Sequence, residues 1–306
     1  MRVVITGGSG LIGGALARDL AAAGDDAVVL TRDPGKLKAL PAGVRAAAWD
    51  GETAEGWAAL LDHPDTAIVH LAGESIAAGR WSEERKRRIR DSRVRSGEAV
   101  LAAIRAAPVK PQALLQGSAV GYYGPHGNEE GEVIDEEAPA GDDFLARVCR
   151  DWEASTAAAE ALGVRRAVLR TGVVLARDGG ALPRIAMPFR MMAGGPLGDG
   201  RQWFPWIHLA DQVGAIRFLL SRDDARGPFN LTAPHPVTNR ELTRLLARVL
   251  HRPGFLPAPA FALRLALGEM ADMLLHGQRV VPGRLLALGC SFQYPDAETA
   301  LRNLLG

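Results

Sequence analysis

The chain has 306 residues, of which 47% are hydrophobic and 23% charged, the balance of a globular protein with an ample hydrophobic core. Its 36 basic and 35 acidic residues leave a net charge of +1, which argues against charge-driven binding to nucleic acid or to an anionic membrane. The longest uncharged stretches, such as Pro253–Leu263, fall far short of the ~20 apolar residues of a membrane-spanning helix.

Short β-branched runs alternate with longer Ala- and Leu-rich segments of helical period through roughly residue 230. In chain order, strands are expected at Val3–Thr6, Ala27–Thr31, Ala46–Trp49, Thr66–Leu71, Ala113–Gly117, Ala167–Arg170 and Pro228–Leu231. Helices are expected between them at Leu11–Ala23, Ala54–Leu61, Glu83–Ala107, Leu145–Leu162 and Ala210–Ser221. This alternation predicts an α/β fold, a doubly wound parallel sheet of the Rossmann type.

The strand pattern fades after about Thr232, and a Pro-rich stretch leads into helices expected at Ala260–Leu275 and Asp296–Leu305. We therefore predict two domains. Residues 1–232 form the nucleotide-binding Rossmann domain, with 176–202 contributing to a substrate lobe. Residues 233–306 form a smaller, mostly helical lobe that closes over the substrate.

Two features bear on the compartment of the protein. Gly7 and Gly8 end the first apolar run after only a few residues, a pattern unlike that of a secretory signal. Cys149 and Cys290 are too few for a disulfide framework or a multi-cysteine zinc site. We expect a cytoplasmic protein with no metal site, no membrane contact and no nucleic-acid partner, and the sequence leaves its oligomeric state open.

A glycine-rich motif lies between the first strand and the first helix. Gly8, Gly10 and Gly13 fit the pattern G-x-G-x-x-G, and Gly7, Gly10 and Gly13 fit G-x-x-G-x-x-G equally well. Glycines let the backbone turn tightly and approach a pyrophosphate, which the N-terminus of the following helix attracts. The motif predicts a dinucleotide cofactor rather than a ligand-free turn, with contacts from Thr6, Gly7, Gly10, Leu11, Ile12 and Gly13.

The end of the second strand bears on the choice of dinucleotide. An acidic residue there would bind the ribose 2′-hydroxyl of NAD, whereas an arginine accommodates the 2′-phosphate of NADP. The strand ends at Thr31-Arg32, and a guanidinium can bind a phosphate through two parallel hydrogen bonds. Asp33 follows directly, so a solvated surface arginine is the alternative. We predict NADP as the cofactor.

Seven further segments carry a family resemblance. They are His70–Glu74, Arg80-Trp81, Ser92-Arg93, Gly117–Gly124, Asp151–Glu153, Arg170–Leu175 and Phe204–His208. Together with the glycine motif, they make nearly the whole chain similar to the extended short-chain dehydrogenases/reductases. More narrowly, it resembles the NAD(P)-dependent epimerase/dehydratase-like family with a C-terminal domain of unknown function, whose members are labelled nucleoside-diphosphate-sugar epimerases.

The resemblance implies particular cofactor contacts. Thr31 and Arg32 should touch the adenosine 2′-phosphate, and Leu71, Ala72 and Gly73 should lie along the adenosine and pyrophosphate. Arg93 should reach the cofactor from the long helix. Ser118 and Val174 should lie beside the nicotinamide, at the carboxyl ends of the fifth and sixth strands.

The catalytic residues of the resembled family are largely missing. The family uses a Ser or Thr, a Tyr and a Lys four residues after the Tyr, because a nearby ammonium lowers the pKa of the phenol. The chain's tyrosines are Tyr122, Tyr123 and Tyr294, and none is followed by that lysine. Alignment puts Leu145 at the Tyr position and Cys149 at the Lys position. Only Ser118 remains, so the ordinary dyad mechanism is excluded.

Other side chains could move the proton. We expect Ser118 and Tyr123 to be catalytic, with Glu74 and His208 as alternatives. Each also has a purely structural interpretation: Tyr123 as a pocket wall, Glu74 as a backbone or Arg80 partner, and His208 as a support of the domain junction. Cys149 has no visible basic partner and is expected to be an inert buried thiol.

These observations predict an atypical NADP(H)-dependent oxidoreductase or epimerase-like enzyme that acts on a small carbonyl or hydroxyl substrate. Trp203, Phe204, Trp206 and Tyr123 would give its pocket an aromatic lining. The alternative is a non-catalytic NADP(H)-binding sensor or interaction protein, which the missing Tyr-x-x-x-Lys pattern makes serious. The two interpretations differ in whether any substrate drives oxidation of NADPH.

Overall fold

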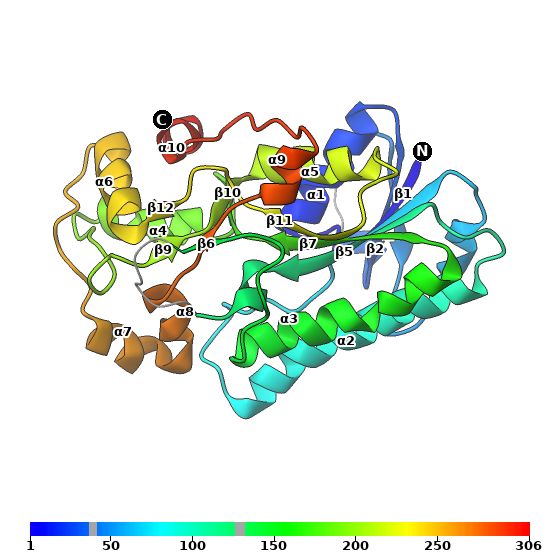
Figure 1. Cartoon of the computed structure of the whole chain (residues 1–306), viewed down its shortest axis with the longest axis horizontal. Coiled ribbons are helices and arrows are strands. Elements are labelled where there is room, and N and C mark those ends of the chain that lie inside the picture. The colour runs from blue at the N-terminus through cyan, green and yellow to red at the C-terminus, as the bar shows by residue number, and fades with distance from the viewer. Residues whose placement is uncertain (37–41, 126–131) are drawn as a thin grey trace.

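Seven short apolar runs pair side by side into one parallel sheet in the computed structural model, which describes residues 1–36, 42–125 and 132–306 (Figure 1). The strands are β1 (Arg2–Thr6), β2 (Asp26–Thr31), β3 (Val44–Ala48), β4 (Thr66–His70), β5 (Ala113–Ala119), β7 (Arg165–Thr171) and β11 (Gly227–Leu231). Their spatial order is β11-β7-β5-β4-β1-β2-β3. The predicted doubly wound α/β fold is confirmed.

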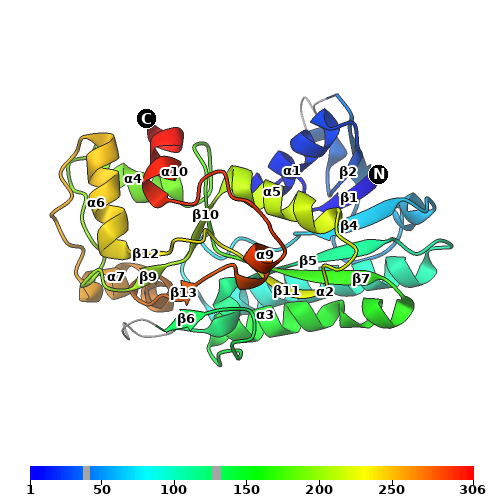
Figure 2. The same cartoon turned by 45° about the horizontal axis from the view of Figure 1, so that its top comes forward.

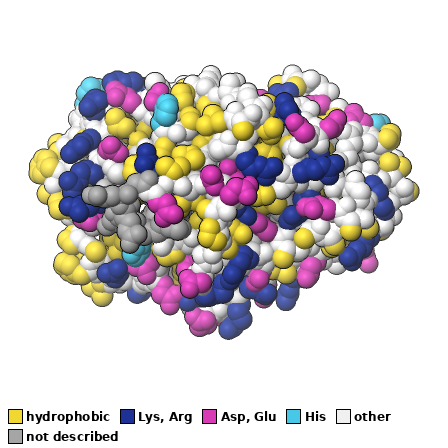
Figure 3. Space-filling view, in the orientation of Figure 1, with side chains coloured by type: hydrophobic (Ala, Val, Ile, Leu, Met, Phe, Trp, Pro, Cys, Tyr) yellow, Lys and Arg dark blue, Asp and Glu magenta, His cyan; other side chains and the backbone are white. Residues whose placement is uncertain are grey.

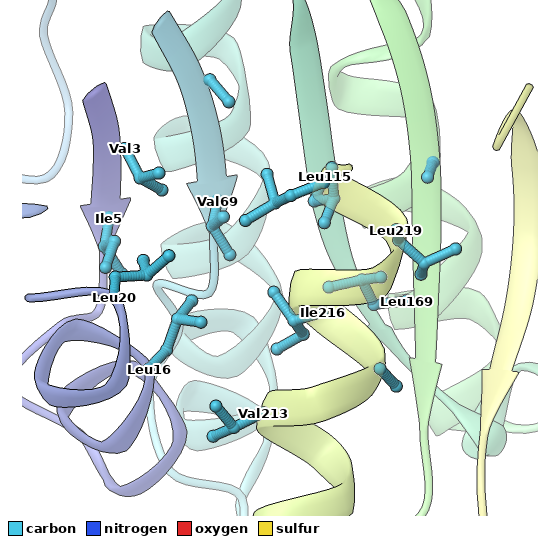
Figure 4. Close-up of a cluster of buried hydrophobic side chains, with 14 of the residues drawn as sticks. Val3, Ile5, Leu16, Leu20, Val69, Leu115, Leu169, Val213, Ile216 and Leu219 are labelled. Carbon is cyan, nitrogen blue, oxygen red and sulfur yellow. The ribbon is translucent and has the colours of Figure 1, made fainter. Parts of the chain in front are cut away.

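Helices cover both faces of the sheet (Figures 1 and 2). One face carries α1 (Leu11–Ala22) and α5 (Leu209–Leu220), and the other carries α2 (Glu83–Ala106) and α3 (Phe144–Ser155). Figure 4 shows the first of these layers, where Leu16 and Leu20 of α1 and Ile216 of α5 point at the apolar side chains of the strands. Because both faces are covered, the central strands are buried almost throughout.

The strand order places a crevice between β1 and β4. The chain leaves β1 toward β2 on one side of the sheet and later returns to β4 on the other side of β1. In doubly wound folds, ligands bind outside the carboxyl ends of the strands at such a reversal. The residues that follow Thr6 and His70 therefore face the expected cofactor site.

The rest of the chain forms a second body of smaller elements. α4 (Leu182–Arg190), α6 (Asn239–Leu250) and α10 (Ala297–Leu305) share one apolar cluster with β8 (Val173–Leu175) and β10 (Trp206–His208). α7 (Ala260–Leu267) and α8 (Asp272–Leu275) lie at one end of the molecule (Figure 1). The short pairs are β8 with β10, β9 (Trp203–Phe204) with β12 (Val237–Thr238), and β6 (Val133–Ile134) with β13 (Arg279–Val280).

Part of the C-terminal segment packs against the outer edge of the sheet. In α9 (Gly283–Ala287), the guanidinium of Arg284 donates hydrogen bonds to the carbonyl oxygens of Arg226 and Pro228, at 2.7 Å each. Leu285 and Cys290 join the apolar cluster under α1 and α5. The predicted boundary between residues 232 and 233 stays a prediction.

Several predicted elements differ from the structure. The helix expected at Ala54–Leu61 is a single 3₁₀ turn at Ala58–Leu61, because Gly56 adopts a left-handed conformation (φ +78°). The helix expected at Leu145–Leu162 ends at Ser155, where the next residue, Thr156, donates a hydrogen bond to Gln116 Oε1 (2.9 Å). The helix expected at Ala260–Leu275 breaks at Gly268, which also has positive φ (+63°). Three observed helices, α4, α6 and α9, were not predicted from the sequence.

Within the ranges that the structure describes, no helix is both long and apolar enough to cross a membrane. The same part of the chain contains no group of three or more His, Cys, Asp or Glu residues that could hold a metal ion.

Candidate functional site

The glycine-rich loop is packed so tightly that side chains would not fit at three of its positions. A Cβ on Gly13 would lie 2.5 Å from the carbonyl oxygen of Gly7, and one on Gly8 would lie 2.5 Å from Val29 Cγ1. Gly7 has φ +69°, and a Cβ there would meet Leu71 O at 2.8 Å. A Cβ on Gly10 would meet only Gly7 O, at 3.2 Å. Gly10 is thus the glycine that leaves room outside the loop for a ligand.

The loop delivers the N-terminus of α1 to the crevice. Gly10 is the N-cap residue in an extended conformation, with no side-chain hydrogen bond to the helix, and the first turn has no acidic residue. The first N–H groups of a helix have no partner within the helix, and the helix dipole makes this end positive. Leu11 and Ile12 lie in this first turn. The arrangement fits a bound pyrophosphate without any side-chain contact.

Thr6 fastens the loop to the neighbouring strand. Its buried hydroxyl accepts hydrogen bonds from the backbone N–H groups of Leu71 and Ala72, at 3.1 Å each. It also lies 2.7 Å from His70 Nδ1. The side chain of Thr6 therefore positions the β1 and β4 ends rather than reaching outward. Leu71 and Ala72 are half-buried beside the loop, as expected for residues along a cofactor.

His70 is a buried, neutral histidine. Trp152 Nε1–H donates to its Nε2 (3.3 Å), and complete burial, reinforced by the charge of Arg93, lowers the pKa of His70 to about 3. Because His70 stays neutral in the folded protein but is protonated below about pH 6.5 when unfolded, its contribution to stability is present above that pH. The contribution is lost as the pH falls from 6.5 toward 3.

We expect the free energy of unfolding to fall by about 2 kcal/mol between pH 7.5 and pH 5 on account of His70 alone. Urea unfolding of the parent and of His70→Gln at both pH values measures this. The variant is less stable at pH 7.5 but loses less stability on acidification. Equal losses in both proteins would show that His70 is protonated in the folded state.

The end of β2 presents an exposed arginine. Asp33 Oδ1 accepts a hydrogen bond from the N–H of Gly35 (3.1 Å), which keeps this carboxylate on its own turn. Thr31 Oγ1 accepts from the N–H of Asp33 (3.4 Å). Across residues 1–36, 42–125 and 132–306, the guanidinium of Arg32 makes no hydrogen bond or ion pair. It is thus available to an anionic group at the strand end.

Arg93 supports the segment that follows β4. Its Nη1 donates to the carbonyl oxygens of Glu74 (3.0 Å) and Ile89 (2.9 Å), and its guanidinium lies 5.0 Å from the Trp152 ring centroid. A Cβ on Gly73 would lie 3.0 Å from Arg93 Cζ. Burial lowers the pKa of Arg93. Because Gly73 has no side chain, it leaves room for the Arg93 guanidinium to pack against the backbone of the crevice.

Ser118 lies at one end of a network of buried, hydrogen-bonded polar side chains at the carboxyl ends of the strands. Its hydroxyl donates to Glu153 Oε1 (2.7 Å), and it is only 5% exposed. Glu153 binds Arg170 through both carboxylate oxygens, with Nε–Oε1 at 3.0 Å and Nη2–Oε2 at 3.1 Å. Although burial opposes its charge, Glu153 raises the pKa of Arg170. The Ser118 hydroxyl thus donates its hydrogen bond to a carboxylate that also binds the Arg170 guanidinium.

Tyr123 belongs to the same buried hydrogen-bond network and contacts Arg170 on the side opposite Glu153. Its phenol donates to Asn230 Oδ1 (2.6 Å) and accepts from Arg170 Nη1 (3.2 Å). Burial raises the pKa of Tyr123 to about 12, and the side chain is 2% exposed. This geometry favours the structural interpretation of Tyr123, since a buried phenol with two fixed partners is a poor proton donor at neutral pH.

The two alternative proton donors are also engaged. Glu74 binds Arg88 Nη2 (2.6 Å) and Arg85 Nη1 (3.3 Å), and the hydrogen bond from Arg88 lowers the pKa of Glu74. An ionised carboxylate cannot serve as a general acid. The structural interpretation expected the backbone or Arg80 as the partner of Glu74; the structure pairs its carboxylate with Arg85 and Arg88, in the first two turns of α2.

His208 caps α5 rather than facing the crevice. Its Nδ1 accepts from the N–H of Ala210 (3.0 Å), so Nε2 carries the proton and donates to Asn303 Oδ1 (3.2 Å). The ring stacks on Tyr294 at 4.0 Å, and burial lowers the pKa of His208. These contacts join α5 to α10 and match the structural interpretation of this residue.

The positions expected for the family's Tyr and Lys are apolar and close together. A Cβ on Gly121 would touch Leu145 Cβ (3.4 Å) and Cys149 Sγ (3.9 Å). Burial raises the pKa of Cys149 to about 11, and its thiol faces the carbonyl oxygen of Ala119 (3.7 Å). The thiol is therefore protonated at neutral pH, in agreement with an inert role. Val174 is half-buried in β8, opposite Ile207 of β10.

Three residues that organise the buried polar network were not among the predicted site residues: Glu153, Arg170 and Asn230. A usable signal was present, because Arg165, Arg166 and Arg170 are charged residues within an otherwise apolar strand of the sheet. Buried charges in a central strand require partners. Of the expected aromatic lining, Trp206 and Tyr123 are 1% and 2% exposed, so they pack in the interior.

Comparison with known protein families gives two matches. The model of the NAD dependent epimerase/dehydratase family matches residues 3–250, and that of a domain of unknown function (DUF1731) matches residues 258–304. The chloroplastic epimerase family protein SDR39U1 homolog of Arabidopsis thaliana is 42% identical over 100% of this chain and 87% of its own length. Epimerase family protein ML0860 of Mycobacterium leprae is 41% identical over 98% of this chain and 94% of its own.

A solved structure extends the similarity to three dimensions. The crystal structure of human epimerase family protein SDR39U1 (isoform 2) with NADPH superposes with a TM-score of 0.87 at 35% identity. The match covers 100% of this chain and 99% of the human one.

Proposed function

This chain belongs to the NAD dependent epimerase/dehydratase family, and on that basis we propose that it is an atypical NADP(H)-dependent oxidoreductase or epimerase-like enzyme. Its substrate would be a small molecule with a carbonyl or hydroxyl group. Family membership supports this proposal over a non-catalytic sensor, and the NADPH bound to the human relative supports the choice of cofactor. The observation that carries it is the combination of the N-terminus of α1, which has no side-chain cap, with the exposed Arg32, which has no partner among the residues that the structure describes.

The residues of the crevice suit NADP(H). The N-terminus of α1 would hold the pyrophosphate, and Arg32 would bind the adenosine 2′-phosphate. Leu71, Ala72 and Gly73 would line the adenosine side. When bound, NADPH supplies the hydride, and the protein's part is to hold the reacting groups in place and exclude water.

Hydride transfer to a carbonyl also requires a proton, and the side chains that could supply it already have partners. Glu74 is held ionised and Tyr123 is fixed between Asn230 and Arg170, so neither is free to protonate a substrate. Ser118 donates its own proton to Glu153, and its oxygen lone pairs remain available. We propose that Ser118 accepts a hydrogen bond from a substrate hydroxyl and thereby orients the substrate. Tyr123 would hold Arg170 in place by accepting a hydrogen bond from its guanidinium.

We expect NADPH to bind about ten- to a hundredfold more tightly than NADH, because Arg32 forms charge-assisted hydrogen bonds worth ~1.5–3 kcal/mol each with the 2′-phosphate. Arg32→Asp should erase or reverse this preference, since an acidic residue would bind the free 2′-hydroxyl of NADH. Isothermal titration calorimetry with both nucleotides measures the change. Added salt should weaken NADPH binding more than NADH binding.

Arg222→Asp is the control, because Arg222 is a half-buried arginine that forms an ion pair with Asp224, two residues further along the chain. It should leave the nucleotide preference unchanged. Equal affinities for NADPH and NADH in the parent would contradict the assignment of Arg32. A screen of carbonyl compounds for substrate-dependent oxidation of NADPH tests the enzyme itself, and NADPH binding without turnover of any compound would favour the sensor.

A further inference from the structure

One end of the molecule carries a surface that is apolar, rich in arginine and built from segments without acidic residues. It comes from residues 179–198 and 242–268, which contain six arginines and no Asp, Glu or Lys. We call it the acid-free face and define it by its exposed side chains Met187, Met191, Met192, Phe255, Phe261 and Leu265. Figure 3 shows hydrophobic side chains at the surface over the end that α7 occupies in Figure 1.

The two segments lie side by side. Three backbone hydrogen bonds join them: Leu256 N–H to Gly194 O (3.0 Å), Ala258 N–H to Pro196 O (2.9 Å) and Gly198 N–H to Ala258 O (2.9 Å). These bonds bring the end of α4 against the residues that lead into α7. The face is therefore one surface held by backbone contacts, rather than scattered exposed residues.

α7 has no buried residue although seven of its eight residues are apolar. Phe261 and Leu265, one helical turn apart, are 74% and 77% exposed. Helices of this composition are normally covered on all sides. Leaving such a helix open to water costs solvation free energy, so the exposed side of α7 is best explained as a surface that another molecule covers.

Backbone strain is concentrated in the same two segments. Met192 (φ 63°) and His251 (φ 52°) are the two non-glycine residues with positive φ among those that the structure describes. They follow the end of α4 and end α6, positions where glycine adopts this conformation freely. Folding alone favours glycine there. Retention of an exposed methionine at Met192 points to a use for the side chain.

We propose that the acid-free face binds an acidic, amphipathic segment of another protein. Met, Phe and Arg are enriched in protein–protein interfaces, whereas Lys, Asp and Glu are depleted, and the face follows this composition. Arg190 and Arg252 have no acidic partner in the described part of the chain, while Arg264 is paired with Asp272 (3.4 Å). Free guanidinium groups around apolar side chains complement carboxylates that flank apolar side chains.

Two other occupants fit less well. A second copy of this chain on a two-fold axis would place the face against the same face, whose two segments supply no carboxylate to pair with the arginines. Surfaces that bind lipid combine Lys and Arg with Trp, Tyr, Phe or Leu; residues 179–198 and 242–268 contain Arg, Phe and Leu but no Trp, Tyr or Lys, and the net charge of +1 gives the chain no general attraction to anionic lipid. None of the residues assigned to the cofactor lies on this face, although residues 179–198 fall within the stretch 176–202 that was expected to contribute to the substrate lobe.

The test is a random peptide-display library selected on the full-length protein, followed by affinity measurements on individual peptides. The expected binders are apolar at helical spacing and rich in Asp or Glu. Phe261→Ser/Leu265→Ser and Arg190→Glu/Arg252→Glu should each weaken their binding by about tenfold or more. Leu286→Ser, at a 47% exposed leucine of α9, is the matched control and should leave binding unchanged.

Melting temperature and NADPH affinity of each variant show that the fold and the cofactor site are intact, since the replaced side chains are exposed. Selection of basic or purely apolar peptides, or binding that survives both double variants, would overturn the proposal. A dimer in sedimentation that Phe261→Ser/Leu265→Ser dissociates would identify a second copy as the occupant. Flotation with phosphatidylserine-rich vesicles that is lost in the same variant would identify lipid.

Discussion

Gly13→Ala is expected to weaken NADPH binding by more than about a hundredfold. The added Cβ would lie 2.5 Å from Gly7 O and 2.7 Å from Gly8 Cα, both backbone atoms of the loop that carries the helix N-terminus to the crevice. Displacing this loop removes at least two hydrogen bonds to charged phosphates, worth ~1.5–3 kcal/mol each. Calorimetric titration with NADPH measures the loss.

Two other glycine variants serve as controls for Gly13→Ala. Gly10→Ala should weaken binding less, because its Cβ meets only Gly7 O, at 3.2 Å. Gly214→Ala lies within α5 with no atom within 4 Å of the new Cβ, so it should leave NADPH binding intact and raise helix stability by roughly 0.5–1 kcal/mol. NADPH affinity unchanged in Gly13→Ala would show that the loop does not bind the pyrophosphate.

Glu153→Ala is expected to lower the free energy of unfolding by about 3–5 kcal/mol, the cost of leaving a buried charge without its partner. The variant strands the guanidinium of Arg170, which is 5% exposed, and removes the acceptor of the Ser118 hydroxyl. Arg170→Leu should cost a similar amount for the same reason. Urea unfolding followed by circular dichroism measures both changes.

Glu298→Ala is the matched control, because Glu298 also pairs with arginines, Arg302 and Arg248, but at the surface. Exposed pairs of this kind contribute roughly 0–1 kcal/mol. If Glu153→Ala costs no more than Glu298→Ala, the buried polar network is not a determinant of stability. Such an outcome would leave Ser118 free to act without its carboxylate partner.

Much of the fold follows from local pattern. The helix expected at Glu83–Ala107 is observed at Glu83–Ala106, since Ser82 caps its start and the apolar period persists through it. The missed α6 had an equally clear start: Thr238 and Glu241 form a reciprocal capping box ahead of an apolar face. That helix could have been predicted. α4 could not, because prolines at its second residue and inside it obscure the helical period.

The candidate site likewise contains residues that a local motif predicts and residues that it does not. The glycine loop and Arg32 were predictable because their roles depend on residues adjacent in the sequence. The partners of Ser118 and Tyr123 were not, since Glu153 lies 35 residues from Ser118 and Asn230 lies 107 residues from Tyr123. Such pairs depend on the register of β5, β7 and β11, which aligns Ser118 with Arg170 and Arg170 with Asn230. Neither register is encoded in a local motif.

The outer edge of β11 also affects folding during translation. A β-strand edge is a template for pairing with other chains, and here side chains occupy it: Arg284 binds the carbonyl oxygens of Pro228 in β11 and of Arg226 just before the strand, and Glu136 accepts the N–H of Asn230 (2.9 Å). Arg284 is translated more than 50 residues after β11. On the ribosome, the newly formed sheet therefore passes through a period in which Arg284 does not yet cover this edge, and association between nascent chains then competes with completion of the fold.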